Sequence, residues 1–176
     1  TEAELVELPA LPQGWRWVRL GAALDQISDG PFGSNLKSTD YVDSGVPVVR
    51  LENIGVQIFN SEKKSFVSEA KYATLRQHTV SAGDVVFSSF LSDQVRACVL
   101  PDSVERAINK ADCFCLRPVS KVLNRYMCLS FTNRCFYHAL ARHVHGATRP
   151  RVNTTQLREA PFPLPPLAEQ RRIVAE

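Results

Sequence analysis

Residues 30–37 read GPFGSNLK, and residues 45–54 read GVPVVRLENI. The first stretch opens a segment rich in Gly, Ser, Asn, Asp and Thr, so we expect a loop over residues 30–44. The second stretch contains a short β-branched run, which predicts a buried strand with Pro47 near its start, where a missing N–H is tolerated. We expect Phe32 to anchor the loop in the core while the polar side chains beside it stay exposed.

The pattern of apolar residues predicts mainly strands on both sides of these stretches. Short runs bounded by turn residues predict further strands over residues 15–20, 56–59, 65–67, 85–88, 95–100 and 113–116. We expect the strands at 56–59 and 65–67 to pair across the polar turn between them.

Helical spacing is concentrated in the last third of the chain. Apolar residues at steps of three and four predict one helix over residues 124–144, with Gly146 as its stop signal. Ser68 is expected to cap a short helix that runs to Leu75, and Asn153 is expected to start another. Strands first and helices later favour an α+β fold, mixed or antiparallel and β-rich, over a doubly wound parallel sheet.

The end of the chain changes character at four prolines, at positions 161, 163, 165 and 166. They predict a rigid, extended connector. Residues at helical spacing then follow at Leu167, Gln170, Arg171 and Val174. We therefore expect one folded domain over residues 1–160, and over residues 161–176 a proline-rich connector and the start of a longer helix.

Composition is that of an ordinary globular domain. With 176 residues, 44% hydrophobic and 22% charged, the chain can bury a core of its own. No apolar run approaches the roughly 20 residues that span a bilayer, and the acidic N-terminus lacks the order of a signal peptide. Five cysteines cannot all pair within one chain, so we expect reduced, mostly buried thiols and a cytoplasmic protein.

Basic residues are unevenly distributed along the chain. The net charge is only +3, yet residues 113–158 contain no Asp or Glu, while eight Lys and Arg and three His lie among them. This acid-free segment predicts a positive face toward a polyanion. A solvated, arginine-rich helix face is the alternative.

Motifs that carry catalysis or metal binding are missing. The cysteines and histidines do not show the paired Cys-x₂₋₄-Cys spacing of zinc sites, so we expect no metal. The sequence has no Gly-x-Ser-x-Gly elbow, no dinucleotide-binding glycine motif and no P-loop. We therefore expect no catalytic residues in this chain.

Polar residues that suit nucleic-acid contacts occur in four places: the loop after Gly30, the end of the strand at residues 46–51 with its turn, the polar cluster at residues 88–96, and residues 143–151. Ser, Thr, Asn, Gln and Lys reach phosphates and base edges, Arg suits guanine, and Asn and Gln suit adenine. The predicted DNA-binding residues are Ser34, Asn35, Lys37, Arg50, Asn53, Gln94, Arg96, His143, His145, Thr148, Arg149 and Arg151. The two arginines around Pro150 further predict a phosphate clamp. For Asn53, a turn residue that bonds to its own backbone is an equally good interpretation.

Several motifs share one order with a known family. They are Leu11-Pro12-x-Gly14-Trp15, the two stretches quoted first, residues 83–88 (GDVVFS), residues 146–148 (GAT) and residues 163–174 (PLPPLAEQRRIV). In this order and spacing the chain resembles the target recognition domain of type I restriction-modification specificity subunits. It departs from that pattern at residues 90–93 (FLSD), where the family often has a pair of glycines.

The resemblance implies a function that neither composition nor spacing gives. Such a chain would be a non-catalytic, sequence-specific DNA-binding specificity subunit or half-subunit that reads one half of a bipartite target. Residues 1–160 would form the DNA target recognition domain, and residues 161–176 would begin the family's conserved spacer helix. A partner helix would meet Leu167, Gln170, Arg171 and Val174.

The resemblance also implies partners and cofactors. The partners would be double-stranded DNA, a methyltransferase subunit, a restriction and translocase subunit, and a second recognition domain or another copy reached through the helix. S-adenosylmethionine, ATP and Mg²⁺ would belong to the partner subunits, with no cofactor in this chain.

Two other functions remain open at the level of sequence. One is a recognition domain from a single-chain restriction-methylation enzyme, which a methyltransferase motif upstream of this segment would reveal. The other is a protein-interaction module or decoy that binds the methyltransferase subunit and not DNA. DNA binding at low salt separates the decoy from the DNA-recognition domains.

Overall fold

The computed structural model describes residues 8–144 and 150–176, which divide into two compact units. Unit 1 is made of the described residues within Thr1–Gln26, Phe90–Val95 and Arg117–Glu176. Unit 2 is made of Ile27–Ser89 and Arg96–Leu116. The chain crosses from one unit to the other within β2 (Leu24–Ser28), before and after the segment Phe90–Val95, and within β10 (Cys113–Pro118).

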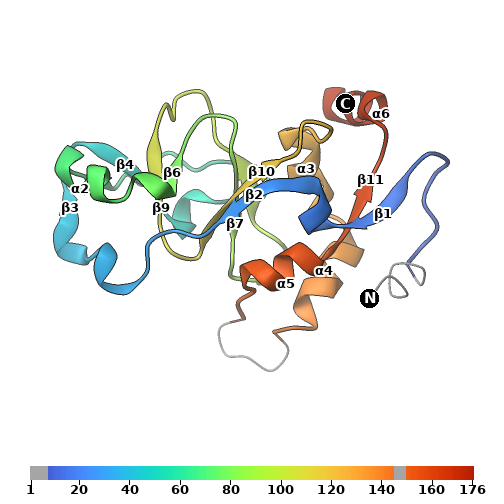
Figure 1. Cartoon of the computed structure of the whole chain (residues 1–176), viewed down its shortest axis with the longest axis horizontal. Helices are drawn as coiled ribbons and strands as arrows, with labels where there is room; N and C mark the ends of the chain where they lie inside the picture. The colour runs from blue at the N-terminus through green and yellow to red at the C-terminus, as the bar shows by residue number, and fades with distance from the viewer. Residues whose placement is uncertain (1–7, 145–149) are drawn as a thin grey trace. The chain divides into compact units, whose positions relative to one another are not determined.

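Unit 2 is built mainly from short strands (Figure 1). Its five-stranded sheet contains, in spatial order, β3 (Tyr41–Val42), β5 (Phe66–Val67), β4 (Val46–Val49), β9 (Ala107–Asn109) and β6 (Thr79–Val80). β4 and β9 pair in parallel, and the other neighbours are antiparallel. A second, antiparallel group joins β10 to β7 (Val85–Ser88) and β7 to β8 (Ala97–Val99). The mixed pairing, with helices elsewhere in the chain, confirms the predicted α+β fold.

The strands of unit 2 enclose two clusters of buried apolar side chains. The larger cluster contains Val49, Ile54, Val80, Val86, Cys98, Leu100, Val104, Ala107, Cys113 and Cys115. The smaller cluster contains Leu36, Val46, Val48, Val67, Leu75 and Ile108. Cys113 and Cys115 alternate along β10 with Phe114 and Leu116, which are also buried. Side chains two positions apart share one face of a strand, so both thiols enter the same cluster.

Short helical elements connect these strands. They are the 3₁₀ turns η2 (Gly33–Asn35), η3 (Ser38–Asp40), η4 (Leu51–Asn53) and η5 (Arg76–His78), and the helix α2 (Glu69–Thr74). Ser68 caps α2 as predicted, because its side chain accepts a 3.1 Å hydrogen bond from the Lys71 N–H.

Unit 1 combines a two-stranded ribbon with four helices. Its elements are β1 (Arg16–Arg19), η1 (Leu20–Ala23), α3 (Asn124–Ser130), α4 (Arg134–Ala141), α5 (Thr154–Glu159), β11 (Pro161–Leu164) and α6 (Leu167–Ala175). The core holds a stacked pair, Phe131 and Phe136, with ring centroids 4.8 Å apart. Asn153 caps α5 in a reciprocal arrangement with Gln156, which confirms the short helix predicted there.

The prediction of one helix over residues 124–144 is wrong, because the structure divides it into α3 and α4. The break falls at a Phe-Thr-Asn sequence. Ser130 and Thr132 donate their hydroxyls to backbone carbonyls three residues earlier, and the Asn133 side chain accepts from the Cys135 N–H to cap α4. Polar side chains that bond nearby backbone compete with continuation of a helix.

The predicted pairing of residues 56–59 with 65–67 is also wrong. β5 pairs with β3 and β4, whereas Phe59 bridges back to Ile54 and Val56 bridges to Ala97. Gln57 has a φ of 63°, so the chain reverses within residues 54–59 instead of extending.

The proline-rich segment 161–166 begins with a strand. β11 pairs antiparallel with β1, with Val18 opposite Phe162, and Figure 1 shows the two strands side by side. Prolines at every second position are compatible with a ribbon that pairs on one side only. The observed units therefore divide the chain differently from the predicted domains 1–160 and 161–176, whose functional division stays a prediction.

The described part of the chain contains no helix of the length and apolar character that crossing a membrane requires.

Candidate nucleic-acid interface

The loop that follows Asp29 is held at both of its ends. The Asp29 Oδ1 accepts hydrogen bonds from the backbone N–H of Gly30 (2.7 Å) and of Asp112 (2.9 Å). A Cβ at Gly30 would lie 2.1 Å from the carbonyl carbon of Lys110, so only glycine fits this close approach. At the other end, Leu36 is buried in the smaller core cluster.

Between these anchors and directly after Leu36, the loop exposes polar side chains. The predicted residues Ser34, Asn35 and Lys37 are all exposed, which is what a contact with DNA requires. The prediction that Phe32 anchors the loop in the core is wrong, because its side chain is 59% exposed. Pro31, the preceding residue, is the buried one.

Burial raises the pKa of Asp29 to about 6, and the two N–H donors and His78 only partly offset this effect. The carboxyl therefore changes charge close to neutral pH while it holds the loop against Asp112. Burial also raises the pKa of the Cys113 thiol, so this cysteine is not a ready nucleophile.

Arg50 follows β4 and has several partners inside unit 2. Its Nη1 donates to the Ser65 Oγ at 3.2 Å, and its Nε lies 3.3 Å from a Glu52 carboxylate oxygen. The guanidinium also lies over the Tyr41 ring, 5.7 Å from the centroid. To contact a base, this half-buried side chain would have to break its bonds to Ser65 and Glu52. Its predicted base contact stays a prediction.

Asn53 is buried, with 4% of its surface exposed, and its side-chain amide is fully used within unit 2. The Oδ1 accepts from the Arg50 N–H at 2.9 Å, and the Nδ2 donates to the carbonyl oxygens of Asn60 and Lys63, both at 2.8 Å. The structure therefore agrees with the interpretation of Asn53 as a turn residue. A direct base contact by this side chain is not available in the described conformation.

Arg96 also stabilises the turn near Asn53. Its Nη1 donates to the carbonyl oxygens of Leu51 (3.1 Å) and Ile54 (3.4 Å), and its Nη2 donates to the Ser88 Oγ (3.0 Å). The guanidinium of this half-buried arginine is therefore bonded to groups of the protein and is only partly accessible to solvent. The neighbouring Gln94, in contrast, is exposed.

In unit 1 two of the predicted loops are joined. Phe90 and Arg151 form an antiparallel bridge, and the Arg151 guanidinium lies over the Phe90 ring, 4.3 Å from its centroid. The Leu91 N–H donates to the Pro150 carbonyl at 3.1 Å. The structure therefore brings the exposed Arg151 and the segment of Gln94 together, although they lie far apart in the sequence.

Helix α4 contacts the segment that contains Gln94, because the Tyr137 hydroxyl donates to the Ser92 carbonyl oxygen at 2.7 Å. The exposed residues His138, Arg142 and His143 lie on α4 or just after it. We call the exposed side chains of Gln94, His138, Arg142, His143 and Arg151 the unit 1 basic surface. The predicted residues His145, Thr148 and Arg149 lie outside the described residues.

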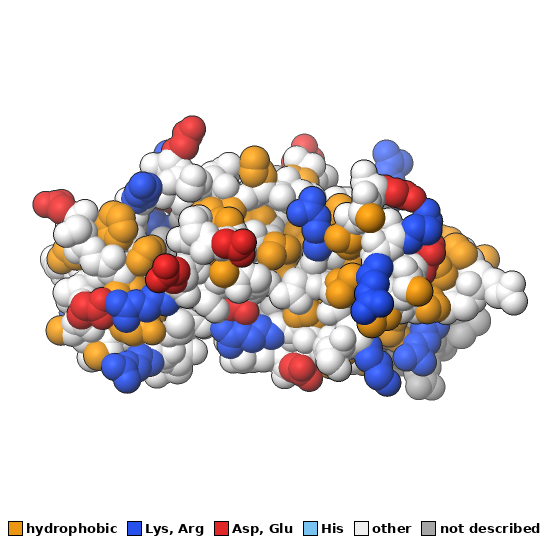
Figure 2. All heavy atoms as spheres, turned by 90° about the horizontal axis from the view of Figure 1, so that it is seen from above, with side chains coloured by type: hydrophobic (Ala, Val, Ile, Leu, Met, Phe, Trp, Pro, Cys, Tyr) orange, Lys and Arg blue, Asp and Glu red, His pale blue; other side chains and the backbone are white. Residues whose placement is uncertain are grey.

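The distribution of charge differs between the two units. At the right of Figure 2, Lys and Arg side chains are spread over the part of the chain that carries α6, with few acidic side chains among them. On the part that carries α2, acidic and basic side chains are mixed. The acid-free segment predicted to face a polyanion thus lies mainly in unit 1.

The residues predicted to meet a partner helix do not share one exposed face of α6. Gln170 is 0% exposed, and it holds α6 to its own unit. Its Oε1 accepts from the Leu123 N–H, and its Nε2 donates to the carbonyls of Lys121 and Pro165. Assigning Gln170 to the partner face is therefore wrong. Arg171 is exposed, whereas Leu167 and Val174 are half-buried.

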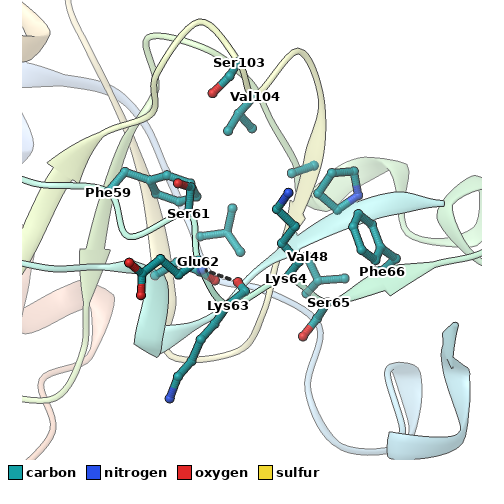
Figure 3. Close-up of a pocket in the computed structure, with 14 residues that line it drawn as sticks. Val48, Phe59, Ser61, Glu62, Lys63, Lys64, Ser65, Phe66, Ser103 and Val104 are labelled. Carbon is teal, nitrogen blue, oxygen red and sulfur yellow. Dashed lines mark hydrogen bonds between the residues drawn. The ribbon is translucent and has the colours of Figure 1, made fainter. Parts of the chain in front are cut away.

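A pocket of about 680 Å³ opens in unit 2 beside β4 (Figure 3). Val48, Phe59, Phe66 and Val104 contribute its apolar walls, and serines and lysines of residues 61–65 line its rim. Figure 3 shows the Lys64 side chain extending into this space, whereas Lys63 points away. Of the predicted DNA-binding residues only Asn53 lines it, so the pocket and the exposed loop tip are separate features.

Sequence patterns missed the aromatic residues of these surfaces. Phe32 was expected inside, and neither Phe90 nor Tyr137 was singled out, although both hold the unit 1 basic surface together. The one available signal was the run at residues 90–93, where the chain departs from the family pattern. Among the described residues, no group of three or more His, Cys, Asp or Glu side chains could hold a metal ion.

Comparison with known families identifies the family of this chain. Residues 35–175 match the family described as "Type I restriction modification DNA specificity domain". Because the match spans most of the sequence, this chain belongs to that family.

A curated relative and two solved structures extend the comparison. The chain is 24% identical, over 95% of its length, to the type I restriction enzyme MjaVIII specificity subunit of Methanocaldococcus jannaschii. It superposes on the HsdS subunit from Thermoanaerobacter tengcongensis with a TM-score of 0.61 and 26% identity over 95% of this chain and 37% of that one. A structure concerned with complex assembly and conformational transition of the type I R-M system gives a TM-score of 0.66 and 27% identity, covering 95% of this chain and 38% of that one.

The chain spans only part of each of these proteins. It covers 39% of the MjaVIII specificity subunit, and the shares of the two solved chains are similar. The similarity therefore covers one specificity domain and does not extend to the activity of a whole subunit.

Proposed function

We propose that this chain is a DNA target recognition domain that reads one half of a bipartite site for a type I restriction-modification system. The observation that carries the proposal is the family match over residues 35–175, on a fold that exposes polar loops in both units. Ser34, Asn35 and Lys37 would contact DNA from unit 2, and the unit 1 basic surface would contact DNA from unit 1.

The two groups would make different kinds of contact. Arg142 and Arg151 suit phosphates, because a guanidinium carries a positive charge and the sequence from 113 to 158 contains no acid. Asn35 and Gln94 suit base edges, because an exposed amide offers both a donor and an acceptor. Phosphate contacts would position the domain, and amide contacts would give it sequence preference.

The proposal gives no catalytic role to this chain. Methyl transfer and DNA cleavage would belong to partner subunits, which would also bind S-adenosylmethionine, ATP and Mg²⁺. The exposed side of α6, including Arg171, would contact a methyltransferase subunit or a second recognition domain. A protein that reads chromosomal or entering DNA would act in the cytoplasm.

The test is selection from a randomised duplex library at low salt, with and without the methyltransferase subunit of the same system. Enrichment of one short motif by this chain or by the complex is the expected result. Failure to bind DNA in both conditions would overturn the proposal and favour a protein-interaction module. Binding without enrichment in both conditions would overturn the claim that the chain reads sequence.

A further inference from the structure

Phe32 is the one aromatic residue among the large hydrophobic side chains that the described residues leave well exposed. Its exposed fraction is 59%, and the other two such side chains are Val42 at 40% and Ile58 at 60%. Phe side chains usually contribute to cores or interfaces, so an exposed ring indicates a contact with a partner.

The loop around Phe32 holds the ring outside. Pro31 is buried immediately before it, and Leu36 is buried four residues after it. The Phe32 carbonyl accepts a 3.2 Å hydrogen bond from the Asn35 N–H, which closes the turn η2. With buried residues on both sides and a closed turn between them, the backbone that carries the ring is held by the fold.

The neighbours of Phe32 suit a nucleic acid better than a protein surface. Of the two acids that flank the loop, Asp29 is half-buried and accepts hydrogen bonds from the backbone N–H of Gly30 and of Asp112, and Asp40 is paired with Lys71 at 3.1 Å. Residues 30–39 between them contain Lys37 and no acid. The exposed side chains beside the ring are polar, whereas the centre of a protein interface is usually a cluster of apolar groups. A single ring flanked by donors for phosphate matches the alternation of stacked bases and charged backbone in DNA.

We infer that Phe32 is a wedge that inserts its ring into one base step of the bound duplex and partly unstacks it. The inference rests on the proposed function and adds a means of reading DNA that needs no hydrogen bond to a base. Pyrimidine–purine steps are the easiest to unstack, so the wedge would favour a TA or CA/TG step at its position.

The experiment uses the full chain and a duplex that carries 2-aminopurine beside a single TA step, within the motif that library selection gives or within random flanks. Binding of the unmodified chain is expected to raise the 2-aminopurine fluorescence, because the base loses a stacking partner. Phe32→Ala should abolish that rise and weaken binding by roughly 5- to 150-fold, which is the fold-change equivalent to the stacking of one base on an aromatic ring. Phe32→Trp should retain both.

Ile58→Ala is the matched control, because it removes an equally exposed apolar side chain from the same unit. It should leave both the fluorescence rise and the affinity unchanged. Circular dichroism should show that Phe32→Ala folds like the unmodified chain.

The outcomes separate this inference from the proposed function. If the unmodified chain binds DNA but Phe32→Ala binds equally well and gives the same fluorescence, the wedge is wrong and the proposed function stands. If Phe32→Ala retains DNA binding but loses the methyltransferase subunit, the ring contacts protein, and the wedge is again wrong. If the unmodified chain binds no DNA either with or without the methyltransferase subunit, both are overturned.

Discussion

Two asparagines of unit 2 illustrate how differently the same residue is used. Asn53 lies in a turn after β4, is 4% exposed, and makes three side-chain hydrogen bonds to backbone groups. Asn35 lies at the tip of a loop, is exposed, and donates only its backbone N–H to the Phe32 carbonyl among the bonds described. Both suit adenine as residue types, yet only Asn35 has an amide that is available to a ligand.

Other predicted site residues divide in the same way, into buried and surface side chains. Arg96, Asn53 and Gln170 stabilise the protein from within, whereas Asn35, Gln94 and Arg151 lie at the surface. We expect substitutions in the first group to change the free energy of unfolding and substitutions in the second to change DNA binding.

Gln170→Ala should give the largest loss of stability. It removes a 0% exposed amide and leaves the Leu123 N–H and the carbonyls of Lys121 and Pro165 without their partner. We expect the free energy of unfolding to fall by about 3 kcal/mol, because buried polar groups that lose partners cost more than the bonds themselves contributed. Urea denaturation followed by circular dichroism measures this change.

Arg171→Ala is the control on the same helix, because Arg171 is exposed. It should change the free energy of unfolding by less than about 0.5 kcal/mol. Equal losses at the two positions would mean that the amide of Gln170 does not hold α6 to its unit.

Arg151→Ala should give an intermediate effect, which appears mainly in DNA binding and only slightly in stability. Loss of one phosphate contact should reduce the steepness of log affinity against log salt by about 0.9. The loss of its contact with Phe90 should cost the fold about 0.5–1 kcal/mol at most, because the pair is on the surface. A titration at several salt concentrations measures the slope, and an unchanged slope would remove the unit 1 basic surface from the interface.

The effect of Asp29→Asn should appear only in the pH dependence of the free energy of unfolding. The folded chain retains a proton on Asp29 up to about pH 6, whereas an ordinary aspartate loses it near 3.8. The free energy of unfolding therefore receives a contribution from Asp29 below pH 3.8 that is lost as the pH rises to about 6. Asparagine keeps an Oδ1 acceptor for Gly30 and Asp112 and does not titrate, so this decline should disappear.

Urea denaturation at several pH values between 4 and 7 measures the decline. Asp93→Asn is the control, because Asp93 is exposed. If Asp29→Asn keeps the full pH dependence of the unmodified chain, another group is responsible for it.

Local chemistry made much of the fold predictable. The strands at residues 85–88 and 113–116, the cap at Ser68 and the start of α5 at Asn153 follow from β-branched runs and from side chains that accept backbone N–H groups. The break between α3 and α4 was not foreseen, because the apolar spacing continues through Thr132 and Asn133 while their hydrogen bonds end the helix.

The sequence predicted where the candidate site lies better than it predicted which side chains are available there. The polar loop after Gly30 follows from its composition, and the exposure of Ser34, Asn35 and Lys37 agrees with it. Whether a polar side chain is available depends on backbone groups brought close by the fold, as the contacts of Arg96 with residues more than 40 positions earlier illustrate. Sequence spacing does not contain that information.

The most direct test of this account compares Asn35→Ala with Asn53→Ala in DNA binding, under conditions in which circular dichroism shows both variants folded. We predict that Asn35→Ala weakens binding by about 1–3 kcal/mol, as loss of a base or phosphate contact does, with unchanged stability. Asn53→Ala should lose stability and, in its folded fraction, bind DNA like the unmodified chain. Loss of DNA affinity at Asn53 with none at Asn35 would contradict the account.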